Sequence, residues 1–207
     1  MAKIVEILLL MMLLCACTRQ RERIEIAGDE DFREGDMVLR CGWGVESQAV
    51  VQAGHSLYSH IGMLHYDVDR EMWMVIHAVP GEAINGEPEY VKCEPLSVFY
   101  APERARRGAW LRVACSDSIA KAAATYAMQK VAAQTIFDND YLLSDTIQLY
   151  CTELVWQAYL HQGIDISDRR RHDVPLLFSK DGACIFPNDI EDSSKTLFVQ
   201  PFKTRRQ

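Results

Sequence analysis

The sequence predicts an α+β fold in which an antiparallel sheet packs against helices, and two observations lead to that prediction. Residues 57–79 have the pattern of a β-hairpin, with two runs of β-branched and aromatic residues on either side of a polar turn at residues 67–70. Residues 117–133 and 151–161 instead carry apolar residues at helical spacing. Strands and helices segregated along one chain are typical of this class.

The first half of the chain is expected to supply most of the strands. Gly35 favours a turn before the first strand, and Gly54 is suited to end a short helix that follows it. The predicted elements are a strand at Asp36–Arg40, a helix at Val45–Ala53, hairpin strands at Leu57–Tyr66 and Glu71–Val79, and a strand at Glu89–Cys93. Residues 95–108 are expected to be irregular.

The second half is expected to supply two longer helices. Ser116 or Asp117 can cap the alanine-rich helix, which runs to about Ala133 after a strand at Ala109–Cys115. The second helix runs from Cys151 to about His161, and Gly163 suits the position just beyond its end. The expected buried stripes are Ile119, Ala123, Tyr126, Ala127 and Val131 in one helix and Leu154, Val155, Ala158 and Tyr159 in the other. Short strands are predicted at Val174–Phe178, Ala183–Phe186 and Thr196–Phe202.

The hairpin turn determines where two histidines lie. A turn centred between Val68 and Asp69 places His60 opposite His77, on the same face of the sheet and with Cβ atoms about 5 Å apart. A slip of one residue would send the two rings to opposite faces. The hairpin therefore predicts a pair of neighbouring imidazoles.

Composition limits the classes of function. The chain has 207 residues, 49% of them hydrophobic and 25% charged, which predicts an ordinary globular protein with one substantial domain. Its formal net charge is −7, and its basic clusters are short and separated. A nucleic-acid partner is therefore not expected.

The first residues have the pattern of a targeting segment. Lys3 precedes a mostly apolar run, and Leu14-Cys15-Ala16-Cys17 resembles a bacterial lipobox, in which Cys17 would be lipidated. The apolar run is shorter than the ~20 residues of a membrane span. We expect a signal peptide at 1–16, a lipidated tether at 17–34 and a folded domain at 35–207, anchored in the cell envelope at the outer membrane and facing the periplasm.

The cysteine count allows a free thiol. Of seven cysteines, Cys15 leaves with the leader and Cys17 carries lipid, so five remain in an oxidising compartment. At least one of the five must stay unpaired. The other four permit up to two disulfides, and the sequence does not choose their pairing; these four are Cys41, Cys93, Cys115 and Cys184. No paired Cys or His spacing of the zinc-binding kind is present, so neither a metal nor another cofactor is expected.

Cys151 begins a predicted helix, where the helix dipole favours thiolate over thiol. Acyl transfer by a thiol needs a base and a polar group that orients the base. His60 is the expected base and His77 the expected orienting residue. The N–H of Cys151, together with the hydroxyl of Tyr150 or Tyr58, is the expected oxyanion site.

Each of these residues alone also has a structural interpretation. An unpaired cysteine in an apolar helix is more often a small core residue, and a lone histidine on a strand is more often a core histidine with its hydrogen bonds made. The combination of a cross-strand histidine pair with a cysteine at the start of a helix favours a functional site.

Four motifs carry a family resemblance. They are Glu34-Gly35-Asp36-Met37-Val38, Tyr58-Ser59-His60-Ile61-Gly62-Met63, Val75-Ile76-His77-Ala78-Val79 and Tyr150-Cys151-Thr152-Glu153-Leu154-Val155-Trp156. In this order they resemble the motifs of the permuted NlpC/P60 papain-like proteins, specifically the YiiX-like branch, over residues 35–163. The resemblance implies a circularly permuted papain-like fold, with the Cys151 helix packed on an antiparallel sheet that carries both histidines.

The chain departs from this branch at His77, where relatives often have a carboxylate. Histidine at that position resembles unpermuted NlpC/P60 enzymes and the lecithin:retinol acyltransferase-like group. Phe137-Asp138 resembles a Tyr-Asp pair of the family, so Asp138 either shapes the pocket or caps an ordinary loop. Tyr141 and Trp43 either line a cleft or fill the core. Ser59 is a further candidate for the oxyanion or substrate-binding site.

The sequence and the resemblance together predict a lipid-anchored cysteine hydrolase that cleaves amide bonds, most plausibly in peptidoglycan stem peptides or related small peptides. Its expected partners are a peptide or cell-wall fragment and the membrane. One alternative is a cysteine acyltransferase or lipase that acts on lipid acyl groups. The other is a lipoprotein without catalytic activity that binds a ligand in the same cleft.

Overall fold

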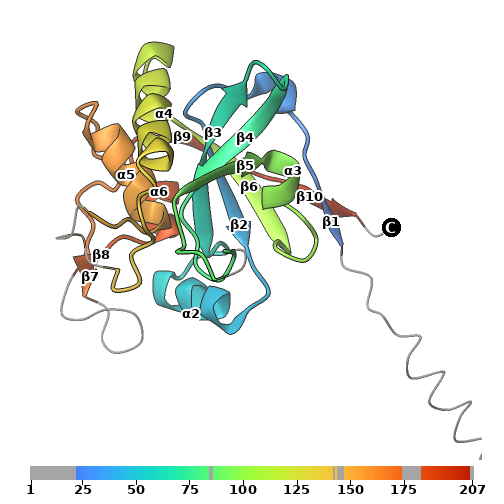
Figure 1. The fold of residues 1–207 in the computed structure, drawn as a ribbon, viewed down its shortest axis with the longest axis vertical. Helices are drawn as coiled ribbons and strands as arrows, with labels where there is room; N and C mark the ends of the chain where they lie inside the picture. The colour runs from blue at the N-terminus through green and yellow to red at the C-terminus, as the bar shows by residue number, and fades with distance from the viewer. Residues whose placement is uncertain (1–21, 84–85, 142, 144–146, 174–182, 206–207) are drawn as a thin grey trace, which may run out of the picture.

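A six-stranded antiparallel sheet, in the order β5-β4-β3-β2-β6-β9, forms the centre of the computed structural model (Figure 1). The structure describes residues 22–83, 86–141, 143, 147–173 and 183–205. The sheet strands are β2 (Met37–Cys41), β3 (His60–Asp67), β4 (Met72–His77), β5 (Lys92–Pro95), β6 (Arg107–Val113) and β9 (Thr196–Pro201). Two small ribbons pair β1 (Arg23–Glu25) with β10 (Lys203–Arg205), and β7 (His172–Asp173) with β8 (Ala183–Cys184). The α+β class with an antiparallel sheet is therefore confirmed.

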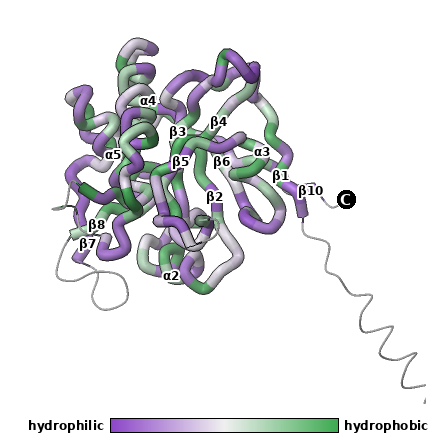
Figure 2. The backbone as a smooth tube through the Cα atoms, in the orientation of Figure 1, coloured by the Kyte–Doolittle hydropathy of each residue, from purple (hydrophilic) through white to green (hydrophobic). Residues whose placement is uncertain are grey.

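Both faces of the sheet are covered, because the strands alternate apolar side chains between two separate cores. Met37 and Leu39 point to the face covered by α4 (Asp117–Ala132) and α5 (Cys151–Leu160). Val38 points to the opposite face, where α3 (Leu96–Phe99) packs. The remaining short helices are η1 (Asp29–Asp31), α2 (Val45–Gly54) and α6 (Pro187–Glu191). Hydrophobic residues are frequent along the central strands β2 and β3 (Figure 2).

The two long helices form as the sequence predicts. The Ser116 side chain caps α4 by accepting a hydrogen bond from the N–H of Ile119. The helix α5 begins at Cys151, and its Leu154, Val155, Ala158 and Tyr159 are all buried in the core on that face of the sheet. The strand predicted at Val174–Phe178 lies outside the described residues.

A tight contact connects α4 and α5 to the sheet at Gly35. Gly35 has φ +80°, and a Cβ there would collide with the backbone of Ala120 in α4. The hydroxyl of Tyr159 in α5 donates to the Gly35 carbonyl at 2.8 Å. Glycine is therefore required at this position for two reasons, its conformation and the approach of α4.

The predicted hairpin register is wrong by two residues. Tyr66 pairs with Trp73 rather than with Glu71, and the last pair before the histidines is Met63–Ile76, so His77 lies next to Gly62 rather than opposite His60. The cause is the turn, where Oδ1 of Asp67 accepts from the N–H groups of Asp69 and Arg70 and so moves the centre of the turn along the chain. Because a shift of two residues preserves the face, both histidines still lie on the same side of the sheet.

Three further predictions need correction or fall outside the structure. Residues 95–108, expected to be irregular, include α3, and the strand expected at Glu89–Cys93 forms as β5 at Lys92–Pro95. The expected tether at 17–34 is too long, because β1 pairs with β10 and Phe32 is buried in the core under α3. The signal peptide and Cys17 lie outside the described residues. No helix in the described ranges has the length and hydropathy that would cross a membrane.

Candidate active site

The site lies where β3 and β4 separate. The β3–β4 ladder runs from Met63–Ile76 to Asp67–Met72, whereas the pairing of β3 with β2 continues to His60–Arg40. The first residues of β3 are therefore paired with β2 but not with β4. The N–H of Ile61 is thus not used in the β3–β4 ladder.

His60 and His77 form the centre of the site. Nε2 of His60 lies 2.8 Å from Nδ1 of His77, and both rings are buried. They share the α3 face of the sheet, where the Phe99 ring lies 5.7 Å from the His60 ring and 5.1 Å from the His77 ring. Gly62, close to His77, leaves the space that this contact needs, since a Cβ there would lie 2.5 Å from Cγ1 of Val75 and 3.1 Å from Cβ of His77.

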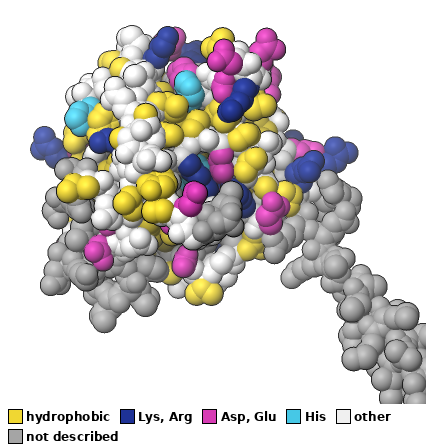
Figure 3. All heavy atoms as spheres, viewed as in Figure 1, with side chains coloured by type: hydrophobic (Ala, Val, Ile, Leu, Met, Phe, Trp, Pro, Cys, Tyr) yellow, Lys and Arg dark blue, Asp and Glu magenta, His cyan; other side chains and the backbone are white. Residues whose placement is uncertain are grey.

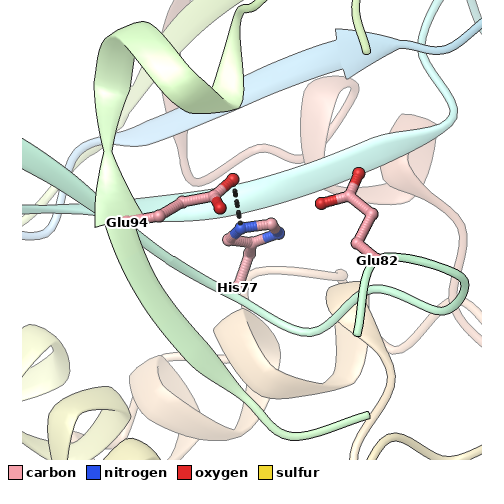
Figure 4. Close-up of side chains that lie close together, drawn as sticks. All are labelled: His77, Glu82 and Glu94. Carbon is pink, nitrogen blue, oxygen red and sulfur yellow. Dashed lines mark hydrogen bonds and ion pairs between the residues drawn. The ribbon is translucent and has the colours of Figure 1, made fainter. Parts of the chain in front are cut away.

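Glu94 extends the histidine pair into a chain of three hydrogen-bonded groups. It lies on β5, one strand beyond His77, and its Oε1 is 3.1 Å from Nε2 of His77. In Figure 4 the His77 ring lies between the carboxylates of Glu94 and Glu82, and the dashed line joins it to Glu94. Both ring nitrogens of His77 are therefore used, one by His60 and one by Glu94.

Three cations hold the two carboxylates. Arg104 contacts Glu94 at 2.9 Å and Glu82 at 3.0 Å, and Lys92 contacts Glu82 at 2.8 Å. The guanidinium of Arg40, almost fully buried, lies 2.5 Å from Glu82 and stacks over Phe99. Hydrogen bonds and charges from the partners of Glu94 outweigh the cost of burial and lower the pKa of Glu94 to about 2. Glu94 is therefore ionised at neutral pH.

Cys151 reaches the site from the opposite face of the sheet, at the first turn of α5. Its sulfur faces the backbone N–H groups of Ile61 and Thr152 and its own N–H. The Thr152 hydroxyl lies 3.6 Å from it. In the described part of the chain, no hydrogen bond joins this sulfur to the His60 ring. The Cys151 helix packs on the sheet that carries both histidines, as the resemblance implies, but on the face opposite to their rings; His60 and Cys151 both line one cavity.

The protonation of the site differs from the expected thiolate. Burial raises the pKa of the Cys151 thiol, although the neighbouring N–H groups and the Thr152 hydroxyl act in the other direction. Burial lowers the pKa of His60 well below its usual value, and the charge of Arg40 lowers it further. At neutral pH the resting pair is therefore a thiol beside a neutral imidazole, because desolvation outweighs the stabilisation at the end of the helix.

A cavity of about 590 Å³ contains both His60 and Cys151 in its wall. Much of the wall is apolar or aromatic; these residues include Trp43, Val50, Val79, Pro80, Phe137, Tyr141, Phe186 and Pro187. The charged groups of the wall are Arg40, Glu46, Glu82, Glu103 and Arg104. Figure 3 shows acidic and basic side chains beside one another near the middle of this view, next to apolar ones. The cavity wall thus combines apolar and charged side chains.

The other predicted site residues divide into two groups. Tyr150, Tyr141 and Ser59 all line the cavity. The Tyr150 hydroxyl accepts a hydrogen bond from the N–H of Ile185 at 2.9 Å, and so holds the segment before α6. Tyr58 packs in the core and Asp138 holds a loop by accepting from the N–H of Asp140, and neither is among the described residues that line the cavity. Cys41, Cys93, Cys115, Cys151 and Cys184 are all free thiols.

Glu94, Glu82 and Arg40 did not emerge from the sequence as site residues. Glu94 becomes visible only when the strand after the hairpin is placed in register with β4, because Ile76–Cys93 pairing brings Glu94 beside His77. Arg40 pairs with His60 across β2 and β3. The signal for Arg40 in the sequence was a charged residue within an otherwise apolar strand.

His77, Glu82 and Glu94 together offer ligand atoms within 4.8 Å of one another, as a metal site would. The surrounding charges do not fit a metal ion. Arg104 and Lys92 already neutralise both carboxylates, and Arg40 adds a third positive charge on Glu82. A divalent cation here would have to displace those side chains and the Glu94 contact of His77.

Comparison with solved structures shows a likeness in fold. No family model and no curated protein matches this chain. Among solved structures, metalloprotein yiiX from Escherichia coli O157:H7 superimposes with a TM-score of 0.64, at 19% identity, over 84% of this chain and 98% of that one. The chain has a YiiX-like fold. At this identity the likeness is informative about the fold alone, and the chemistry of this YiiX-like protein must be argued from its own side chains.

Proposed function

We propose that this chain is a cysteine hydrolase of the permuted NlpC/P60 papain-like type, with Cys151 as nucleophile, His60 as base and His77 as the residue that orients the base. The observation that carries the proposal is the 2.8 Å contact of His77 with His60, which shares the wall of one cavity with Cys151. A nucleophile, a base and a group that orients the base are the three components that thiol-dependent acyl transfer needs.

The neutral resting pair favours general-base catalysis over a preformed ion pair. As the Cys151 sulfur attacks a carbonyl carbon, its proton moves to Nδ1 of His60, the ring nitrogen that His77 does not use. The carbonyl oxygen becomes an oxyanion near the N–H of Cys151 at the start of α5. When the bond to the leaving group breaks, His60 returns the proton to the leaving amine. Water then attacks the thioester, gives its proton to His60 and releases the acid and the thiol.

The substrate we favour is an amide in a peptidoglycan stem peptide or a related small peptide, bound by a lipid-anchored protein of the bacterial envelope. The charged side chains in the cavity wall suit the charged termini and side chains of such peptides. A second candidate is an acyltransferase or lipase reaction on a lipid acyl group. The aromatic and aliphatic wall around Trp43, Val50 and Phe186 favours that candidate.

The name of yiiX describes that protein as a metalloprotein. We infer no metal-dependent step for this chain, since its only close group of potential ligands among the described residues is held by arginine and lysine.

Incubation of the purified protein with muropeptides and with phospholipid vesicles, each analysed by mass spectrometry, tests the proposal. We expect cleavage of muropeptide amides by the wild type and none by Cys151→Ala. Turnover of phospholipid alone would support the second candidate. Binding without turnover of any substrate, unchanged in Cys151→Ala, would contradict the hydrolase and indicate a ligand-binding protein.

A further inference from the structure

Glu94 occupies the end of the hydrogen-bonded chain that starts at His60, and its charge determines where the protons of that chain lie. A carboxylate can only accept hydrogen bonds, so the contact at 3.1 Å requires Nε2 of His77 to carry the proton. A neutral His77 then has a bare Nδ1, which can only accept. Burial lowers the pKa of His77 to about 4, which keeps this ring neutral at physiological pH.

The same reasoning passes to His60. Because Nδ1 of His77 accepts, Nε2 of His60 must donate across the 2.8 Å contact. Neutral His60 is then left with a bare Nδ1, the nitrogen that a base needs. If the end of the chain were a donor instead of Glu94, every proton would move to the other nitrogen and Nδ1 of His60 would be blocked.

We propose that Glu94 is a positioning residue which, through His77, holds His60 in the tautomer whose Nδ1 can take the proton of Cys151. Arg104 and Lys92 keep Glu94 in place and ionised, since they lie 2.9 Å and 3.6 Å from its carboxylate oxygens. In this role, His77 and Glu94 determine which ring nitrogens carry protons, and the cluster that they form with Glu82 does not serve to bind a metal. The catalytic consequence of the inference rests on the proposed function, whereas the tautomers themselves do not.

Glu82 provides a matched comparison. It lies in the same cluster, contacts the same Arg104 and Lys92, and faces the same His77 ring (Figure 4). Its carboxylate is paired with those cations and with Arg40, whereas Glu94 is the carboxylate hydrogen-bonded to His77. Substitution of Glu82 therefore changes the charge of the cluster without removing the acceptor at the end of the histidine chain.

Nitrogen NMR of the histidine rings tests the inference without a substrate. In the wild type, labelled with ¹⁵N-histidine, we expect both His60 and His77 to carry their proton on Nε2. Glu94→Leu should convert both to a mixture or to the other tautomer, whereas Glu94→Gln, whose amide oxygen can still accept, should restore the wild-type pattern. Glu82→Gln should leave the tautomers unchanged. Wild-type tautomers in Glu94→Leu would overturn the proposal.

Two further measurements test the contact between Glu94 and His77 by another route and distinguish proton placement from metal binding. If Glu94→Leu does not fold, Glu94→Gln still tests the contact, because loss of the charge should move the protonation of His77 to lower pH; an unchanged titration would overturn the proposal. Zn²⁺ added to the wild type should leave the His77 ring signals in place, and their displacement at micromolar Zn²⁺ would assign the cluster to a metal instead.

The consequence for catalysis is read from acylation by p-nitrophenyl acetate. We expect Glu94→Leu to slow acylation of Cys151 by about 10- to 100-fold, the usual effect of losing an outer hydrogen-bond partner. Glu94→Gln should recover much of that loss. Failure of the wild type to acylate Cys151 would contradict the proposed function and leave the NMR result as the test of Glu94. Acylation at the wild-type rate in Glu94→Leu would overturn the positioning role.

Discussion

Gly62→Ala is the sharpest structural test of the histidine pair. A Cβ at this position would lie 2.5 Å from Cγ1 of Val75, and 3.1 Å from both the carbonyl oxygen of Ile76 and Cβ of His77. Carbon atoms in contact are normally about 3.5–4.0 Å apart, so the added methyl group overlaps Val75 by about 1 Å. The overlap can be relieved by rotating Val75 or by moving β4 away from β3, and the second response carries His77 away from His60.

Overpacking of one methyl group in a core costs about 1–3 kcal/mol, and we expect Gly62→Ala to lower the free energy of unfolding by that amount. Urea denaturation followed by circular dichroism measures it. Movement of His77 should also slow acylation of Cys151. Gly44→Ala is the control, because its Cβ meets no atom within 4 Å. It begins α2 as the N-cap residue, so a cost below about 1 kcal/mol is expected there. Equal stability of Gly62→Ala and wild type, with unchanged acylation, would refute the packing argument.

Three other predictions follow from the same site. The folded state keeps buried His77 neutral, with a pKa of about 4, whereas the unfolded chain protonates it near pH 6.5; the contribution of His77 to stability should therefore fall by about 1.4 kcal/mol per pH unit from pH 6.5 toward pH 4. Buried His60, whose pKa is lowered in the same direction, adds to the slope of the wild type, and urea titrations should show a smaller slope in His77→Gln. Phe99→Ala should cost about 3–5 kcal/mol in urea unfolding, because Phe99 is fully buried against both histidine rings and the Arg40 guanidinium; a cost below 1 kcal/mol would mean that these groups do not depend on it. Tyr159→Phe should cost about 1 kcal/mol through loss of the hydrogen bond to Gly35, and no change would show that water replaces it.

The sequence predicted the elements well where local chemistry determines them. The Ser116 cap, the start of α5 at Cys151 and the strand after Gly35 all depend on residues within a few positions of one another. The hairpin was predicted with the wrong register, because the side chain of Asp67 shapes the turn in a way that the apolar pattern does not encode. The two histidines were still placed together, since the error was an even number of residues.

The parts of the site that the sequence did not predict depend on long-range pairing. Glu94 reaches His77 only through the β4–β5 register, and Arg40 reaches Glu82 across 42 residues. The state of the thiol was also out of reach, because the helix end predicts a lowered pKa for Cys151 whereas burial in the folded protein raises it. Local patterns thus indicated which groups lie near one another, and tertiary structure determines how they are protonated.

Mapping of the acetyl group after brief reaction with p-nitrophenyl acetate tests the central claim most directly. The claim is that Cys151 is the nucleophile and His60 its base. The variant Cys93→Ser with Cys115→Ser removes the other partly exposed thiols of the described chain and serves as the reference protein. We expect the acetyl group on Cys151 in this reference, formed about 100- to 10,000-fold more slowly when His60 is replaced by Ala. Acetyl groups on other residues alone, or an equal rate without His60, would contradict the account.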